Sequence, residues 1–224
     1  MDVATFIIQA GYGDEAAVRE ALASHPELAA ARNESGVSVI ATTVYAGRLT
    51  LAREIARHRD DLDLFEAACL GDRDRVNSLV DQDPKSIDRF APDGFSAIGF
   101  AAFFGHLELL RLLLERNADF ETPSRNSMCV RPLHSAVAHS DQVRALAMAE
   151  ILLEEGADAN AQQEGGMSPL HEAVHNDNVE LVDLLLRFGA NPHLSNDEGD
   201  SPLQLSQSRI GSATAARLEA ALPD

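Results

Sequence analysis

One short stretch combines residue types and a spacing that are typical of zinc chemistry. His171 and His175 stand four residues apart and enclose Glu172, which gives the pattern H-E-x-x-H. On a helix this spacing places two imidazoles on one face, where they can bind zinc while the glutamate acts as general base. The stretch therefore raises the hypothesis of a zinc-dependent hydrolase that uses His171, Glu172 and His175.

The rest of the sequence gives this hypothesis little support. A catalytic zinc needs a third protein ligand and an open position for water. No G-x-x-H follows His175, and Glu198, at a suitable spacing, lies in N-D-E-G-D, which is typical of a turn. The sequence also contains no phosphate-binding loop, dinucleotide-binding glycine pattern or nucleophile elbow. We therefore expect no cofactor, no bound metal and no enzyme activity.

The elements that carry this stretch belong to a pattern that recurs along the chain. An apolar anchor is followed by small residues and a turn, at spacings of 34, 24, 34, 35, 37 and 33 residues. The anchors are Phe6, Ile40, Leu64, Ile98, Leu133, Leu170 and Leu203. Several modules continue with a second amphipathic run at helical spacing, as in 106–119 and 179–192. The pattern predicts two short helices, a tight turn and a loop in each module.

Three phrases make the pattern specific. They are Gly-Met-Ser-Pro-Leu-His-Glu-Ala at 166–173, Glu-Gly-Ala-Asp-Ala-Asn-Ala at 155–161 and Phe-Gly-Ala-Asn-Pro at 188–192. They resemble the opening G-x-T-P-L-H-x-A and the ending G-A-D-x-N of the ankyrin repeat. The resemblance implies an all-α solenoid of stacked helix-turn-helix modules with β-turn fingers and divergent terminal caps. It also implies a scaffold that binds other proteins on its concave side.

The spacing of the anchors divides the chain into modules. We expect a single ankyrin-repeat domain over 1–224, with modules at 2–34, 35–60, 61–93, 94–127, 128–165 and 166–198 and a cap at 199–224. The cap should contain a helix near Ala213 to Leu222. The short spacing before Leu64 predicts that one finger is missing, and the finger after Asp119 should be irregular. In the segment HSDQVRALAMAE, we expect extra length between the two helices of the module.

The ankyrin resemblance gives the H-E-x-x-H residues structural roles that need no metal. Ser168 is the N-cap, whose hydroxyl accepts a backbone N–H, and Pro169 takes the first helical position. By resemblance, His171 bonds to neighbouring backbone and ties adjacent loops together. The other repeat-motif positions are Leu170, Pro132, Leu133, His134 and the turn glycines Gly94, Gly166 and Gly199. Stacking would also bring His139 near His175, which leaves an adventitious metal site as a second alternative.

The charge of the chain is strongly acidic. It has 18 Lys plus Arg against 36 Asp plus Glu, a formal net charge of −18 and a pI near 4.7. Such a surface repels a phosphate backbone, so we expect no nucleic-acid partner. No apolar run is long enough to span a membrane, and the first residues lack the basic region of a secretory signal. Together with only two cysteines, Cys69 and Cys129, these features predict a cytoplasmic protein without a membrane partner.

The resemblance assigns helix ends and finger tips to the concave side, where a protein partner would bind. The helix-end candidates are Tyr12, Tyr45, Leu70, Phe103, Phe104, His139, His175 and Asn176, and the acidic tips are Glu34, Asp93, Glu164, Asp197 and Glu198. An apolar stripe with an acidic rim predicts a basic protein partner. Core packing also explains the aromatic groups, and turn formation also explains the carboxylates. A further alternative is that the chain regulates an enzyme by occupying its basic substrate site.

Overall fold

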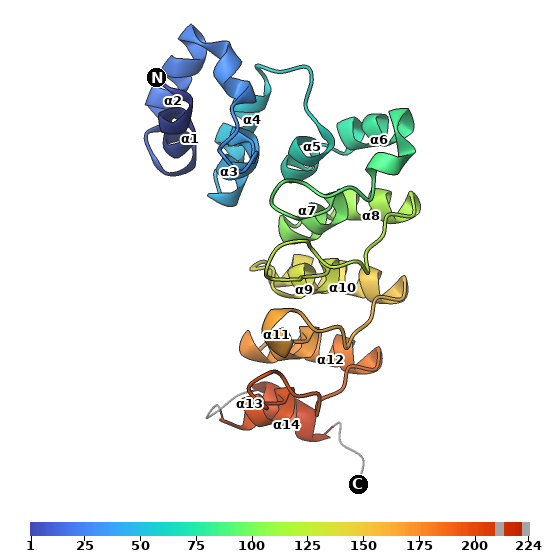
Figure 1. Ribbon diagram of the computed structural model, residues 1–224. Coiled ribbons are helices and arrows are strands. Elements are labelled where there is room, and N and C mark those ends of the chain that lie inside the picture. Colours follow the sequence, from blue (N-terminus) through green and yellow to red (C-terminus); the bar gives the residue numbers. More distant parts are fainter. Residues whose placement is uncertain (209–212, 221–224) are drawn as a thin grey trace. The chain divides into compact units, whose positions relative to one another are not determined.

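The regular structure of the chain is helical (Figure 1). The computed structural model describes residues 1–208 and 213–220. In this part of the chain, the helices follow one another in pairs, and two isolated β-bridges, Arg32 with Ser38 and Phe90 with Ser96, each close a finger. The chain divides into two compact units, residues 1–100 and 101–224.

The first unit contains three helix pairs. They are α1 (Val3–Tyr12) with α2 (Glu15–Ser24), α3 (Val39–Tyr45) with α4 (Leu49–Ala56), and α5 (Leu64–Leu70) with α6 (Arg73–Gln82), together with the 3-10 turns η1 (Pro26–Ala30) and η2 (Pro84–Ser86). Helix α3 packs against both α1 and α5, so it buries Val39, Ile40 and Val44. Helix α7 (Ala97–Phe103) begins in the first unit and ends in the second.

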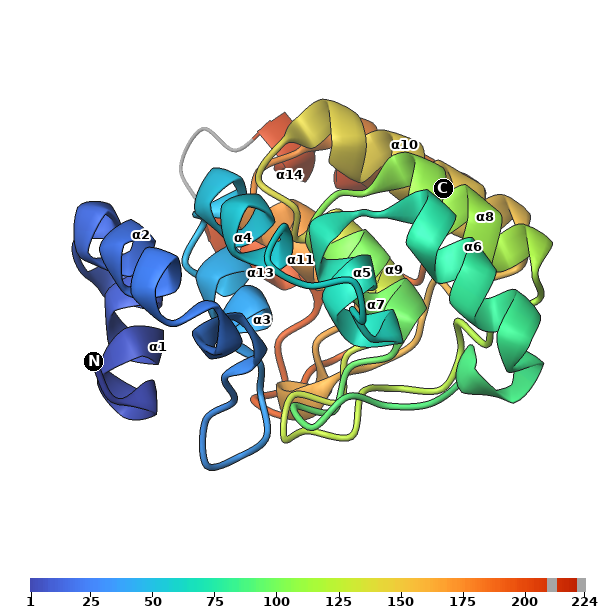
Figure 2. The same ribbon diagram turned by 90° about the horizontal axis from the view of Figure 1, so that it is seen from above.

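The second unit continues the same plan. Its helices are α8 (Leu107–Glu115), α9 (Pro132–Val137), α10 (Gln142–Glu154), α11 (Pro169–His175), α12 (Val179–Arg187), α13 (Pro202–Ser208) and α14 (Ala213–Ala220), with the 3-10 turn η3 (Glu164–Gly166). The first helices of successive pairs, α9, α11 and α13, pack on one another, and so do the second helices α8, α10, α12 and α14. Figure 2 shows α8 and α10 side by side. The predicted stack of helix-turn-helix modules is confirmed.

Local sequence explains where the helices begin and end. Asp63 caps α5, because its side chain accepts the backbone N–H groups of Phe65 and Glu66, both at 2.9 Å. Gly71 ends α5 in the left-handed conformation, at φ 70°. All seven anchors lie in the first helix of a pair and are buried. The hydrophobic pattern therefore fixes which face of each helix forms the core.

Two expectations about element length need correction. The extra length near 139–150 lies mainly in α10, which has 13 residues where α8 and α12 have nine, and not between the helices. Asp141 caps α10 at once, and the alanine- and leucine-rich residues after it favour continued helix. The predicted capping helix corresponds to α14, which pairs with α13, so the cap is a helix pair. Leu222 lies outside the described residues.

The two irregular places are where the sequence predicts them. Between α4 and α5, residues 57–58 form a turn, the rest of the segment to residue 63 is irregular, and neither of the two β-bridges of the described chain falls there. In the segment after Asp119, Ser124 N–H donates to the Val130 carbonyl at 2.8 Å, and Cys129 has a positive φ of 50°. That finger therefore lacks the glycine turn of the regular fingers.

Candidate partner-binding surface

The H-E-x-x-H stretch forms α11, and its two histidines have different environments. The His171 side chain is fully buried, whereas His175 is exposed. His171 Nδ1 lies 3.0 Å from the Ser168 backbone N and 2.8 Å from the Ser168 hydroxyl, and His171 Nε2 lies 3.1 Å from the Asp200 carbonyl oxygen. Because both ring nitrogens have hydrogen-bond partners, a metal at His171 would have to displace them.

Ser168 takes the N-cap position of α11, as the sequence predicts, but its hydroxyl makes no cap hydrogen bond to the helix backbone. The hydroxyl lies 2.8 Å from His171 Nδ1, which also accepts the Ser168 backbone N–H at 3.0 Å. Glu172 accepts a hydrogen bond from the Asn176 side chain at 3.0 Å. Within residues 1–208 and 213–220, no group of three or more His, Cys, Asp or Glu side chains is arranged to hold a metal ion.

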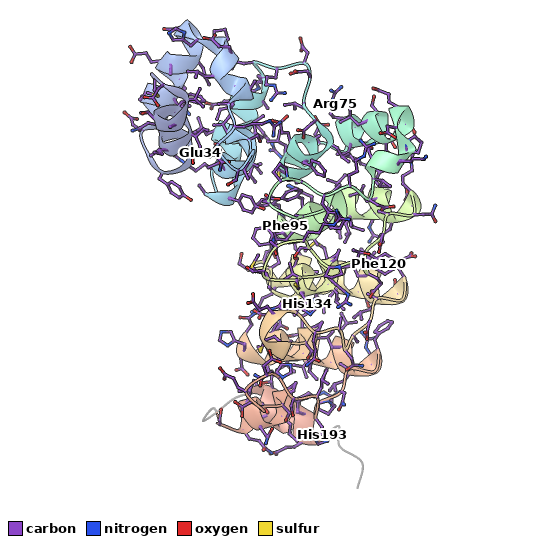
Figure 3. The ribbon with its side chains drawn as sticks, viewed as in Figure 1. Glu34, Arg75, Phe95, Phe120, His134 and His193 are labelled. Atoms are coloured by element: carbon purple, nitrogen blue, oxygen red, sulfur yellow. The ribbon has the colours of Figure 1, made fainter. Side chains whose placement is uncertain are left out.

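His134 repeats the arrangement of His171 in the preceding module. Its Nδ1 accepts the Arg131 backbone N–H at 3.3 Å, and its Nε2 lies 3.0 Å from the Ala161 carbonyl oxygen. Figure 3 labels His134 on α9 in the second unit, where it is only 3% exposed. Burial lowers the pKa of His134 to about 4 and also lowers the pKa of His171. Both imidazoles are therefore neutral links from a first helix to the following loop.

The acidic finger tips of the second unit lie beside their neighbours. Glu164 N–H donates to the Met128 carbonyl at 3.1 Å, and Asp197 N–H donates to the Gly165 carbonyl at 3.0 Å. A Cβ on Gly166 would lie 2.7 Å from the Asp197 backbone N, so only glycine allows this approach. The carboxylates of Glu164, Asp197 and Glu198 are exposed. Adjacent tips thus carry like charges on one edge of the second unit.

The aromatic candidates of the second unit are partly exposed. Phe103 is 42% exposed and meets the half-buried Phe104 edge to face, with ring centroids 5.1 Å apart. His139 packs against Gly105, where an added Cβ would lie 2.4 Å from its Nε2. The remaining candidates, His175 and Asn176, are exposed at the end of α11. An apolar contact and polar groups are therefore available at helix ends of this unit.

The candidates of the first unit are less uniform. Tyr12 is 82% exposed, and Tyr45 is 37% exposed and donates its hydroxyl to Asp93 at 3.0 Å. Burial, followed by the Asp93 charge, raises the pKa of Tyr45. Leu70 is only 5% exposed, because α5 packs against α4 and α6. Leu70 is thus a core residue, and its assignment to a binding surface is wrong.

Sequence reasoning missed a buried carboxylate in the first unit. The side chain of Glu66 is 1% exposed and lies 3.1 Å from Arg32 Nη2 and 2.9 Å from Arg59 Nη1. Its second oxygen accepts the Asp63 backbone N–H at 3.1 Å, which completes a capping box. The capping box D-L-F-E was the only signal available in the sequence. Arg32 is 34 residues from Glu66 and Arg59 is seven residues from it, and no helical or turn pattern in the sequence joins either arginine to the carboxylate.

Comparisons with known proteins give the family. A family model described as ankyrin repeats (3 copies) matches residues 64–163, and one described as ankyrin repeats (many copies) matches residues 152–206. The chain belongs to the ankyrin repeat family.

Its curated relatives are much longer proteins. The B-cell lymphoma 3 protein homolog of Mus musculus is 35% identical over 117 residues, which are 52% of this chain and 25% of that protein. BCL-6 corepressor-like protein 1 of Homo sapiens is 32% identical over 108 residues, which are 48% of this chain and 6% of that protein. The 2-5A-dependent ribonuclease of Mus musculus is 45% identical over 71 residues, which are 31% of this chain and 9% of that protein. The chain thus matches a quarter or less of the length of each of these relatives.

No helix in the described residues is both long enough and apolar enough to cross a bilayer.

Proposed function

We propose that the chain is a non-catalytic interaction module that binds a basic protein partner. Membership of the ankyrin repeat family supports protein–protein interaction, and one relative is named as a corepressor-like protein. The ribonuclease relative matches over only 9% of its length, so its activity is not carried over to this chain. The concave face, formed by helix ends and finger tips, is the proposed binding surface.

The neighbouring acidic tips of the second unit are the observation that carries this proposal. The hydrogen bond from Asp197 N–H to the Gly165 carbonyl holds one acidic tip beside the next. Exposed like charges held close together repel each other, and a basic partner relieves that repulsion. Binding should therefore weaken as salt is raised.

Exposed aromatic and polar groups supply the remaining contacts in the proposal. Phe103 offers a large apolar side chain that its contact with Phe104 already orders. In the first unit, the hydrogen bond to Asp93 orders Tyr45 in the same way. Side chains that are ordered before binding lose little entropy in a complex.

A charge-reversal experiment tests the proposal. The triple variant Glu164→Lys, Asp197→Lys and Glu198→Lys should lose most of its affinity for a fluorescent Lys-rich amphipathic peptide, measured by anisotropy at 50 and 300 mM NaCl. The matched control Glu154→Lys, Glu155→Lys and Glu180→Lys makes the same charge change at exposed positions on α10, at its end and on α12. Binding that is insensitive to salt, or that falls equally in both variants, would refute the finger-tip assignment. An acidic peptide of equal length should not bind.

A further inference from the structure

The first unit contains a cleft between α4 and the turn that joins α5 to α6. The cleft has a volume of about 440 Å³, and its walls combine Arg53, Arg57 and Arg59 with the buried side chains of Leu62 and Leu70. In the second unit, the second helices of successive pairs pack on one another. Helix α4 instead packs on α3 and α5 and, among the described residues, makes no comparable contact with α6. The cleft therefore occurs where the layer of second helices is interrupted.

The segment that forms one wall of this cleft is basic, although the chain is strongly acidic. Residues 48–59 contain four arginines and one glutamate, whereas the whole chain has a formal net charge of −18. Arg53 lies in the last turn of α4, and Arg57 follows the helix directly in a right-handed helical conformation. Residues four apart on a helix lie on the same face, so the two exposed guanidinium groups are neighbours.

These two arginines have no carboxylate partner. Glu54, three residues before Arg57, pairs with Arg19 at 2.7 Å, and this hydrogen bond lowers the pKa of Glu54 more than the charge of Arg57 does. Arg53 makes one long hydrogen bond, from Nη2 to the Leu70 carbonyl oxygen at 3.4 Å. Neither Arg53 nor Arg57 forms an ion pair with a carboxylate of the described residues. Most of their N–H donors are therefore available to a ligand.

The other basic groups at the cleft fix its wall. Arg59 pairs with Asp61 at 2.8 Å and with Glu66 at 2.9 Å, so its charge is already balanced. Arg75, labelled in Figure 3, donates two hydrogen bonds to the Leu62 carbonyl oxygen, at 3.0 and 2.8 Å. These contacts hold the short segment between α4 and α5 in place. A wall that is ordered before binding lowers the entropy cost of a complex.

The charge of the cleft selects the class of ligand. Two neighbouring guanidinium groups without partners match a phosphate monoester, which carries a charge of about −2 at neutral pH and offers three acceptor oxygens. One carboxylate, that of Asp72, also lines the cleft, and the rest of the chain is acidic. A long polyanion, such as a nucleic acid or an anionic membrane surface, would therefore be repelled beyond the cleft.

The exposure of the cleft selects the molecule that carries the phosphate. Sites for small molecules normally enclose most of the ligand surface, whereas the guanidinium groups of Arg53 and Arg57 are exposed to solvent. The remaining contacts must come from a larger molecule that continues past the cleft. A protein segment with neutral or basic residues around a phosphorylated side chain meets this need without repulsion from the acidic chain.

We propose that this cleft binds a phosphoserine of a protein partner, and that Arg53 and Arg57 bind its phosphate group. The cleft and the acidic finger tips belong to different units, so a substitution at one leaves the other unchanged.

A degenerate peptide array with a central phosphoserine, compared with the same array carrying serine, tests the cleft. The wild-type chain should bind the phosphorylated peptides better by about tenfold or more, because only the phosphate accepts charge-assisted hydrogen bonds from the two guanidinium groups. Arg53→Gln combined with Arg57→Gln should abolish this preference. The matched control, Lys85→Gln with Arg187→Gln, makes the same charge change at exposed positions outside the cleft and should keep the preference. Absence of a preference in the wild type, or an undiminished preference in the cleft variant, would overturn the proposal.

Two further measurements use only the wild-type chain, so they do not depend on the folding of a variant. Phenylglyoxal modifies exposed arginines, and the best-bound phosphopeptide should slow modification of Arg53 and Arg57, measured by mass spectrometry, but not that of Arg187. Equal modification with and without the peptide would contradict the assignment of the two arginines. Free phosphoserine should bind much more weakly than that peptide in calorimetry. Equal affinities would show that the ligand is a small phosphorylated molecule and not a protein segment.

Discussion

At the position directly after the anchor, the first unit carries Ile7, Ala41, Phe65 and Gly99, whereas the second unit carries His134, His171 and Gln204. In the second unit, His134 and His171 donate to carbonyl groups of the following loop. The apolar or small residues of the first unit cannot make this bond. The same repeat position therefore links successive modules in one unit and only packs in the other.

The first unit links its modules with charges instead. Arg32 lies at the base of one finger, Arg59 lies in the segment without a finger, and both contact Glu66 on α5. In the module without a finger, the guanidinium groups of Arg32 and Arg59 both contact the buried carboxylate of Glu66. The comparison teaches that a solenoid can replace a neutral imidazole link by an ion-pair network when a module is shortened.

Removal of the shared carboxylate should have the largest effect. Glu66→Ala should lower the free energy of unfolding by about 3 kcal/mol, because it leaves the mostly buried Arg59 without its buried partner. Urea unfolding followed by circular dichroism measures this change. The control is Asp61→Ala, which removes an exposed partner of the same arginine and should change stability little. Equal effects of the two substitutions would show that burial of Glu66 does not matter.

The imidazole link should make the second unit sensitive to acid. The pKa of His134 is about 4 in the folded chain against 6.5 for an ordinary histidine, so the unfolded chain binds the proton first as pH falls. The stability that His134 contributes is complete above pH 6.5 and is lost as pH falls towards 4. Between pH 6.5 and 5 the loss should be about 2 kcal/mol. The free energy of unfolding, measured between pH 6.5 and 5, should depend less on pH in His134→Gln than in the wild type. An equal pH dependence in the two proteins would contradict the proposed role of the neutral His134 link.

The two histidines of the H-E-x-x-H stretch should differ in their effect on stability. His171→Ala removes a buried side chain with partners at both ring nitrogens and should cost about 2 kcal/mol. His175→Ala changes an exposed side chain and should cost less than about 0.5 kcal/mol. If His171 and His175 bound one zinc ion together, each histidine would be needed for the stability that zinc provides. A matched loss of stability in both variants, with bound zinc in untagged wild-type protein, would therefore revive the hydrolase.

The sequence predicted the helix pairs because their physical cause is local. An anchor such as Leu170 must be buried, and its spacing from the next anchor sets the length of the module. Phrases such as Ser-Pro-Leu-His then placed the start of α11 correctly. The short module before Leu64 and the irregular finger after Asp119 were also evident from length and composition.

The contacts between modules were not predictable in the same way. Tyr45 and Asp93 are 48 residues apart, and Arg32 and Glu66 are 34 residues apart, so no local pattern joins them. The prediction for Leu70 failed because its position in the repeat specified the helix end and not which neighbours cover it. Whether the exposed aromatic side chains bind a partner stays a prediction.

The imidazole links of the second unit have a direction along the chain. Each runs from the first helix of a pair to the loop after the second helix of that pair, from His134 to Ala161 and from His171 to Asp200. A truncation from the C-terminal side that removes Asp200 or Ala161 would therefore leave His171 or His134 without its carbonyl acceptor, although the helix that carries the histidine remains. A truncation that removes whole modules from the N-terminal side of this unit would leave the remaining one of these two histidines bonded to its carbonyl.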